Sequence, residues 1–410
     1  VWFRSAYVPV SGLFFVGSRD LVAERYIYMA SVGCAAFTAW LLVGVARRTA
    51  ALTRRASVTA AVAVLALATA AGAARSFVRA ADWKDDRTLF RSALAVDPSS
   101  PRMLFNLAVA LQNSGERDEA ERLYRSVVQH APSFGKASKY LADIYAHTGR
   151  REEAQNVLSE YLRRVPDDAG AWVLLGDEQA AVRNWADSER SFRRAVELLP
   201  NQGLAHFGLG RAMLGEGRSG EALAELQRAA ALAPGSADLL GAVGALLMEA
   251  GHAAEALPLL QDAAKLKPDS ARILTALAEA CLRTNRLDEA DRALKSALAV
   301  DERNPRTRVD AGILARRRGD LEGAEREFRT AIGLEPGEAT HHVHLAQVLA
   351  QSGRADAALE ACGDALARNP RSVEALLVRA EVLFGRSDLD GARAALEQVL
   401  AIDPRSTVAR

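Results

Sequence analysis

GLAHFGLGRAMLGEGRSGEALAELQRAAALAPGS, residues 203–236, is one of nine 34-residue units that follow one another without a gap from Pro101 to Ser406. The units begin at Pro101, Gly135, Ala169, Gly203, Ala237, Ala271, Pro305, Ala339 and Val373. A fixed period of this length indicates stacked helical hairpins, in which each unit buries its apolar face against its neighbours. The inner surface of such a stack is left for partners, so binding is the expected function and chemistry needs separate evidence.

Small residues recur at two positions of the unit, where two helices are expected to approach closely. The eighth residue is always alanine or glycine, and the twentieth is alanine everywhere except at Ser188. A glycine such as Gly115 is expected to end the first helix in the left-handed conformation, and a proline such as Pro132 to end the second. Large side chains recur at the seventh and twenty-fourth positions and are expected to fill the space between hairpins. The weaker fits there are Ala311, Arg379 and Cys362.

These alanine, glycine and proline positions make residues 101–406 resemble the tetratricopeptide repeat family. The resemblance implies an all-α fold, a right-handed superhelix of helical hairpins that binds protein or peptide partners. Residues 82–100 resemble the second half of one more unit, with Phe90, Ala93 and Pro98 at its twenty-fourth, twenty-seventh and thirty-second places. Residues 407–410 form a short tail.

The segment 26–80 before the repeats contains two apolar stretches, at about 26–46 and 56–74. Each has about the 20 residues that a helix needs to cross a bilayer. The linker 47–55 between them carries four arginines, which mark the cytoplasmic side. We therefore expect two transmembrane helices, with the repeats on the extracytoplasmic side. For the second stretch, which is rich in alanine, a buried soluble helix is the alternative.

Residues 1–25 are apolar and aromatic but carry Arg4, Pro9 and Gly12, which suits a re-entrant or interfacial segment better than a full span. The chain begins with valine inside this hydrophobic run and shows no charged lead or cleavage site of a signal peptide. We therefore expect this sequence to be the C-terminal part of a longer multi-span protein.

A second resemblance rests on VPVSGLFF at residues 8–15, VAERYIYMASVG at residues 22–33 and WKDDRTLF at residues 83–90. These stretches, in this order, resemble the last membrane section of the transmembrane and tetratricopeptide-repeat-containing O-mannosyltransferases and their bacterial relatives. Gly12 and Ala30 depart from that family's pattern, where asparagine and proline are usual.

This second resemblance implies a membrane glycosyltransferase that uses a polyprenyl-phosphate-linked sugar, with the repeats presenting an acceptor protein. The catalytic acidic residues of that family lie in an early loop that this sequence does not contain. We therefore assign no catalytic residue, no cofactor and no enzymatic activity to this sequence by itself. The alternative is a non-enzymatic, membrane-tethered scaffold for the assembly of envelope or secretion complexes.

Two candidate binding sites follow from these interpretations. Glu24 and Arg25 stand at the outer end of the first expected span, where Arg25 would hold a lipid phosphate bidentately. An ordinary interfacial arginine is the alternative reading. The second site is a peptide groove at the second, fifth, ninth and twelfth positions of the units, which the tetratricopeptide architecture turns inward. Its candidate residues are Arg102, Phe105, Lys136, Lys139, Phe207, Arg211, Arg272, Arg306 and Arg316.

Acidic residues share the same positions, so an extended acidic or polar peptide is the expected partner. They are Asp143, Asp177, Asp238, Glu279, Glu374 and Glu381. A formal net charge of only +1, without a recurring stripe of basic and aromatic residues, argues against nucleic acid.

Other site chemistries are disfavoured by the sequence. His341, His342 and His344 form the single histidine cluster, but His342 occupies a packing position, so no metal site is assigned. Cys281 and Cys362 are expected to be apolar fillers. Arginine outnumbers lysine 46 to 6, which points to a GC-rich bacterial genome and, with the spans, to a bacterial inner membrane.

Overall fold

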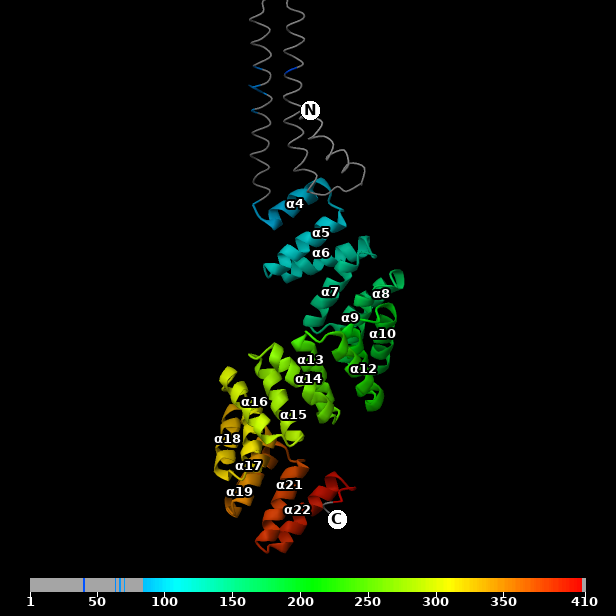
Figure 1. Cartoon of the computed structure of the whole chain (residues 1–410). Coiled ribbons are helices and arrows are strands. Elements are labelled where there is room, and N and C mark those ends of the chain that lie inside the picture. The colour runs from blue at the N-terminus through cyan, green and yellow to red at the C-terminus, as the bar shows by residue number, and fades with distance from the viewer. Residues whose placement is uncertain (1–39, 41–62, 64–65, 68–69, 71–83, 408–410) are drawn as a thin grey trace, which may run out of the picture. The chain divides into compact units, whose positions relative to one another are not determined.

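The structure, a computed structural model, describes residues 84–407 and five isolated residues before them (Figure 1). These five are Trp40, Ala63, Ala66, Leu67 and Ala70. In this described part of the chain, no helix is both long enough and apolar enough to span a bilayer.

Several of the sequence interpretations fall outside the described residues. They concern the segment 1–25 with Glu24 and Arg25, the expected spans at 26–46 and 56–74 apart from the five residues named above, the loop 47–55, and residues 408–410 of the tail.

The described residues from 84 to 407 are all-α, with nineteen helices joined by short turns. Helix α4 (Asp86–Val96) comes first and is followed by nine hairpins. The first helices of the hairpins have 13 residues each: α5 (Pro101–Asn113), α7 (Gly135–His147), α9 (Ala169–Ala181), α11 (Gly203–Gly215), α13 (Ala237–Glu249), α15 (Ala271–Arg283), α17 (Pro305–Arg317), α19 (Ala339–Gln351) and α21 (Val373–Gly385).

The second helices of the hairpins have 14 residues each and complete the repeating unit. They are α6 (Arg117–His130), α8 (Arg151–Arg164), α10 (Trp185–Leu198), α12 (Ser219–Leu232), α14 (Ala253–Leu266), α16 (Leu287–Val300), α18 (Leu321–Leu334), α20 (Ala355–Arg368) and α22 (Leu389–Ile402). Every first helix begins at the residue with which a 34-residue unit begins. The prediction of an all-α solenoid of helical hairpins is therefore confirmed.

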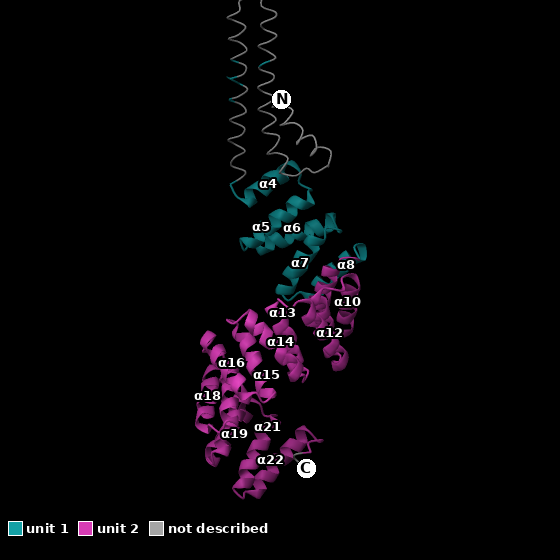
Figure 2. Ribbon diagram, viewed as in Figure 1, with its two compact units in different colours: residues 1–166 teal, residues 167–410 magenta. Residues whose placement is uncertain are grey.

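The chain divides into two compact units, residues 1–166 and 167–410 (Figure 2). Unit 1 contains α4 to α8, and unit 2 contains α9 to α22. Within each unit, the two helices of every hairpin pack against each other and against the next hairpin along the chain. The core of each unit therefore runs along the stack instead of gathering at one centre.

Where the eighth residue of a hairpin is glycine, it lies against the large twenty-fourth residue of the same hairpin. A Cβ atom added to Gly244 would lie 2.6 Å from Leu260 Cγ, and one added to Gly312 would lie 2.6 Å from Phe328 Cε1. The twentieth position is equally tight, since Ser188 is fully buried and its hydroxyl donates a hydrogen bond of 2.8 Å to a main-chain carbonyl of the facing helix. Larger side chains would push the two helices apart.

The turn inside each hairpin requires a left-handed residue at the fifteenth position of the unit. Six hairpins have glycine there, with φ between 73° and 87°. The other three keep the same conformation without glycine, at Arg183 (φ 59°), Asn285 (φ 58°) and Ser387 (φ 64°). The hairpin geometry therefore imposes the left-handed conformation whichever residue stands there.

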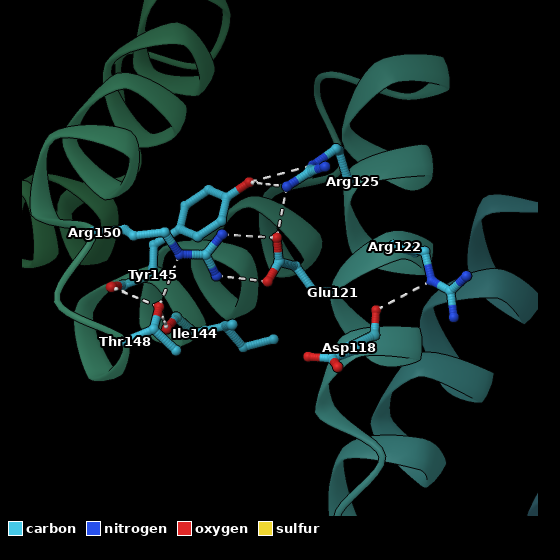
Figure 3. A network of polar contacts seen from close by, with 8 residues as sticks. All are labelled: Asp118, Glu121, Arg122, Arg125, Ile144, Tyr145, Thr148 and Arg150. Carbon is cyan, nitrogen blue, oxygen red and sulfur yellow. Dashed lines mark hydrogen bonds and ion pairs between the residues drawn. The ribbon is translucent and has the colours of Figure 1, made fainter.

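A polar network joins the two hairpins of unit 1 (Figure 3). Glu121, on α6, accepts hydrogen bonds from Arg150 Nη1 at 3.0 Å and Nη2 at 2.5 Å, and from Arg125 Nη2 at 2.6 Å. The guanidinium of Arg150 also lies 4.4 Å from the centre of the Tyr145 ring. The hydrogen bonds from Arg150 hold the pKa of Glu121 below its usual value.

The same pair recurs twice in unit 2. Arg218 Nη1 lies 3.0 Å from Glu189, and Arg354 pairs bidentately with Glu325. In each case the arginine follows the left-handed turn residue, and the glutamate lies on the second helix of the preceding hairpin. Side chains of Glu189 and Glu325 are only 9% exposed. These pairs fix one hairpin to the next. The first two are two repeat units apart and the last two are four units apart, because Leu257 stands at the glutamate position between them.

Candidate peptide-binding groove

The predicted groove residues all lie on first helices, at positions 2, 5, 9 and 12 of the unit. Residues three or four apart share one face of a helix, so these positions form a stripe along each first helix. In unit 1 the stripe carries Arg102 and Lys136, which are exposed, and Lys139, which is half-buried. Phe105 differs from them because only 8% of its surface is exposed. Phe105 is therefore a packing residue and presents little surface to a partner.

Phe105 belongs to an aromatic cluster with Tyr124, Phe134 and Tyr140. Its ring centre lies 5.3 to 5.6 Å from those of the other three rings. Tyr124 is fully buried and donates a hydrogen bond of 2.9 Å to Gln112 Oε1, and burial raises its pKa. Tyr140 is 41% exposed. An aromatic edge therefore reaches the surface of unit 1 through Tyr140, which occupies the sixth position of its repeat.

In unit 2, Arg211 joins two consecutive first helices. Its Nη2 donates a hydrogen bond of 2.6 Å to Asp177 Oδ1, one repeat earlier. The guanidinium also lies 5.9 Å from the ring centre of Phe207 and 6.0 Å from that of Phe192. Burial raises the pKa of Asp177, and the charge of Arg211 acts in the opposite direction. Phe207 is half-buried.

Exposed ion pairs continue this row through the middle of unit 2. Arg272 Nη2 lies 3.9 Å from Asp238 Oδ1, and both side chains are more than half exposed. Arg306 Nη2 donates a hydrogen bond of 2.5 Å to Glu279 Oε2, and the Arg306 side chain is 72% exposed. Consecutive first helices are thus linked by pairs whose arginines are exposed.

Two polar side chains at the sixth position lie deeper than this row. Asp310, on α17, is only 6% exposed, and its Oδ2 atom has no hydrogen-bond partner among the described residues. Burial, followed by the negative charge of Glu279, raises the pKa of Asp310 to about 7. His344, on α19, stacks on Phe328 with ring centres 5.2 Å apart. Burial lowers the pKa of His344.

Arg316 closes the row of predicted basic residues. Its Nη1 donates a hydrogen bond of 2.5 Å to Gln347 Oε1 on the next first helix. Burial lowers the pKa of this arginine, and the nearby charge of Arg317 acts in the same direction. Arg316 is half-buried, so it offers a partner fewer open donors than the exposed arginines do.

The histidines of α19 do not gather around one point. His341 Nε2 lies 3.3 Å from Glu335 Oε2, while His342 Nδ1 lies 3.9 Å from Asp364 Oδ2. Across the described residues, no three histidine, cysteine or acidic side chains are placed to hold a metal ion. Cys281 and Cys362 are fully buried, and burial raises the pKa of both thiols to about 11.

The row of arginines was found from the sequence, but the polar site around Asp310 was not. Its signal in the sequence is an acidic residue at the sixth position, where the other repeats of unit 2 have small or apolar residues or histidine. That signal is weak because charge on a helix usually faces solvent. Burial of Asp310 depends on the neighbouring helix, which the spacing alone does not show.

This geometry defines a class of helical-repeat proteins that expose one stripe of every first helix to a partner. Two family models, each described as tetratricopeptide repeat, match the chain. One matches residues 114–177, 247–308 and 349–410, and the other matches residues 71–132, 173–237 and 309–364. The chain belongs to the tetratricopeptide repeat family.

Among curated proteins, the chain is similar to two protein O-mannosyl-transferases of Drosophila melanogaster. It is 35% identical to Tmtc2 over 118 residues, which are 28% of this chain and 12% of the relative. It is 34% identical to Tmtc3 over 120 residues, which are 29% of this chain and 12% of that relative. The similarity lies in the repeats, and the chain covers only about an eighth of each relative's length.

Among solved structures, the chain resembles a tetratricopeptide repeat protein from Parabacteroides merdae. The TM-score is 0.51 at 16% sequence identity, and the match covers 59% of this chain and 95% of that one. At this identity the likeness supports the fold alone.

Proposed function

We propose that unit 2 binds an extended polar segment of a partner protein along the stripe of its first helices. The observation that carries this proposal is the difference between the two sets of ion pairs. Pairs between the first helices, such as Arg306 with Glu279 and Arg272 with Asp238, include side chains that are 62–72% exposed. Exposed ion pairs contribute little stability, so a partner exchanges with them at low cost.

The pairs that link second helices to the following turns have less exposed arginines, at 33–46%. Their glutamates are 9–15% exposed, and Glu121 and Glu325 bind arginine through both guanidinium Nη atoms, which suits a structural role. We therefore assign the ion pairs between first helices to the binding surface, and the arginine–glutamate pairs of the second helices to the stability of the stack.

We propose further that the repeats are tethered to a membrane by the stretches 26–46 and 56–74, with the arginine-rich loop 47–55 in the cytoplasm. The apolar composition of the two stretches and the four arginines between them support this topology. In this proposal the repeats face the extracytoplasmic side of a bacterial inner membrane.

Within this topology, the repeats would present acceptor proteins to a polyprenyl-phosphate-sugar-dependent protein O-glycosyltransferase of the O-mannosyltransferase type. The support is the similarity to Tmtc2 and Tmtc3, together with the motifs at residues 8–15, 22–33 and 83–90. No residue of the chain is proposed as catalytic. A membrane-tethered scaffold without enzymatic activity would contain the same repeats, so sugar transfer by the full-length protein decides between the two.

Arg25, beside Glu24, is proposed to hold the phosphate of the lipid carrier. Its place at the outer end of the first expected span, next to Tyr26, supports this role, because a charge at a membrane boundary is costly without a function. The test is an Arg25→Ala variant of the full-length protein, for which sugar transfer is expected to fall. Normal transfer by this variant would remove the proposal.

The peptide-binding proposal is tested by selection from a phage library of random dodecapeptides on the purified full chain. We expect enrichment of related polar sequences. The enrichment should be lost when Arg272 and Arg316, both in the groove row, are replaced by alanine. It should persist when Arg228 and Arg292, which are exposed on second helices α12 and α16, are replaced instead. Selection that yields no related sequences would contradict the proposal.

The membrane topology is tested with a thiol label. Leu204 is 56% exposed, and a Leu204→Cys variant places a reactive thiol on the surface of unit 2. The variant is made with Cys34, Cys281 and Cys362 replaced by alanine. A membrane-impermeant maleimide is expected to label it in intact spheroplasts. Labelling only after lysis would place the repeats in the cytoplasm and contradict the proposed topology.

A further inference from the structure

Four charged groups meet where α15 packs against α17. Glu279 and Arg283 come from α15, and Arg306 and Asp310 come from α17. The two helices are held together at this level by a hydrogen bond of 2.7 Å between the buried hydroxyls of Thr275 and Thr307. Arg306 and Asp310 are four residues apart and so lie on one face of α17.

Both arginines of this group direct their hydrogen bonds to acceptors other than Asp310. Arg283 donates from Nη2 to Glu279 Oε1 at 2.7 Å and from Nη1 to the main-chain carbonyl of Met248 at 2.8 Å. Arg306 donates to Glu279 Oε2 at 2.5 Å. Asp310 Oδ2 is left buried without a partner among the described residues.

A buried carboxylate without a donor is costly, and a protein relieves the cost by adding either a proton or a cation. In the absence of a partner protein, Asp310 takes the first route, since burial and the charge of Glu279 raise its pKa to about 7. A cationic group of a bound peptide would provide the second route, with release of that proton.

Arg306 is the more exposed of the two arginines. Its side chain is 72% exposed, whereas the Glu279 side chain that it binds is only 16% exposed. Because the arginine of this pair is well solvated, it turns away from Glu279 at modest cost. When Arg306 turns toward solvent, Glu279 loses one of its two guanidinium partners and the carboxylates of Glu279 and Asp310 become available together.

We propose that Glu279 and Asp310 form a cation-binding subsite in the groove, which receives a lysine or arginine side chain of the bound peptide in place of Arg306. This proposal rests on the proposed peptide-binding function of unit 2 and adds the chemistry of one peptide position. Neighbouring row residues such as Arg272 and Arg316 would contact the polar flanks of the same peptide.

The first test repeats the dodecapeptide selection on the full chain with an Asp310→Asn variant. The wild-type chain is expected to enrich peptides with lysine or arginine at one fixed position. The variant is expected to keep the flanking sequence preference and lose the basic residue. Asp177→Asn is the matched control, because Asp177 is already paired with Arg211, and it should keep the basic preference.

The outcomes separate this proposal from the one on which it rests. Related peptides without a basic position, or an unchanged basic preference in Asp310→Asn, would overturn the subsite and leave peptide binding standing. Failure to enrich any related peptide with the wild-type chain would overturn both. A melting curve for Asp310→Asn confirms that the variant is folded.

The second test measures affinity for one selected peptide and for its lysine→norleucine analogue. The wild-type chain should bind the lysine peptide at least about tenfold more tightly, since an ion pair within a partly buried site is worth more than one on the surface. In Asp310→Asn this difference should shrink to less than about threefold. Arg306→Ala should bind the lysine peptide more tightly than wild type, because it removes the competing cation. Weaker binding by Arg306→Ala would contradict the exchange.

Discussion

At the scale of the residue, close packing of the two helices in each hairpin depends on the eighth position. Glycine there lets the large twenty-fourth residue fit directly against the backbone of the first helix. The contact is tight enough that even a methyl group overlaps the neighbouring side chain, since a Cβ on Gly244 would lie 2.6 Å from Leu260 Cγ and 2.7 Å from Cδ2.

Gly244→Ala is therefore expected to destabilise unit 2 although alanine favours helices. Overpacking costs about 1–3 kcal/mol, which exceeds the roughly 1 kcal/mol that alanine gains over glycine in a helix. Gly363→Ala on α20 is the control, because no atom lies within 4 Å of the added Cβ. That variant should gain about 0.5–1 kcal/mol. Urea unfolding measures both, and equal effects of the two substitutions would show that the contact is unimportant.

Asp310 gives unit 2 a pH dependence of opposite sign to that of a paired carboxylate. Its folded pKa of about 7 lies above the unfolded value of about 3.9. The folded state thus binds more protons between these values, and stability falls as the pH rises through 7. From pH 6 to pH 8, wild type should lose about 1.4 kcal/mol relative to Asp310→Asn.

Urea midpoints of wild type and Asp310→Asn at pH 6 and pH 8 measure this loss. Parallel changes in the two proteins would mean that Asp310 stays charged from pH 6 to pH 8. Another interaction would then have to offset the cost of burying its carboxylate.

Single residues differ in how well the sequence predicts them. The small residues could be predicted because their spacing is fixed by the hairpin itself. The burial of Phe105 and Asp310 could not, because it depends on which side chains the neighbouring helices place against them. Phe105 shares the stripe with exposed arginines, and Tyr124, Phe134 and Tyr140 cover it.

At the scale of the element, the hairpin turn requires a residue with positive φ, and three repeats have no glycine at that position. Arg183, Asn285 and Ser387 adopt positive φ, which costs a side-chain-bearing residue about 1–2 kcal/mol. Asparagine tolerates this conformation better than the other two. The turns at Arg183 and Ser387 are therefore strained positions in unit 2.

Arg183→Gly and Ser387→Gly should each stabilise unit 2 by about 1 kcal/mol, because relief of the strain exceeds the entropy that glycine adds to the unfolded chain. Asn285→Gly should gain less. Gly217→Ala, at the same position of its own repeat, should lose stability. Thermal unfolding of the four variants gives the order. A loss of stability in Arg183→Gly would mean that the arginine side chain contributes more than the turn costs.

The pairing of hairpins by arginine and glutamate was not predicted from the sequence. It occurs in three places spaced by two and then four repeats, with arginine at residues 150, 218 and 354 facing glutamate at residues 121, 189 and 325. Comparison of single repeats hides a pair that only some repeats contain. The starts of the units, in contrast, could be read from the sequence, and every first helix begins at one of them.

At the scale of the whole molecule, the fold could be predicted because a repeat carries the same signal nine times. The partner could not, because binding residues differ from repeat to repeat. Similarity to the O-mannosyl-transferases covers about an eighth of each relative, so the function of the full-length protein stays a proposal.

The reactivity of the buried thiols measures how often the hairpins of unit 2 open locally. Cys281 and Cys362 are fully buried, and their pKa values are raised to about 11. Neither thiol should react with a soluble disulfide reagent at pH 8 without denaturant, because the thiolate is the reactive form. Both should react at the rate of a free thiol in denaturant. Fast reaction of one thiol in native buffer would locate a hairpin that opens locally.

The central claim is that the first helices of unit 2 form the binding surface. The most direct test is the affinity of the full chain for the best selected dodecapeptide in two paired variants. Arg272→Ala with Arg316→Ala should weaken binding at least about tenfold, through loss of two charge-assisted contacts. Arg228→Ala with Arg292→Ala, on the second helices, should change it by less than about twofold. The reverse order, or equal losses from both pairs, would contradict the assignment of the groove.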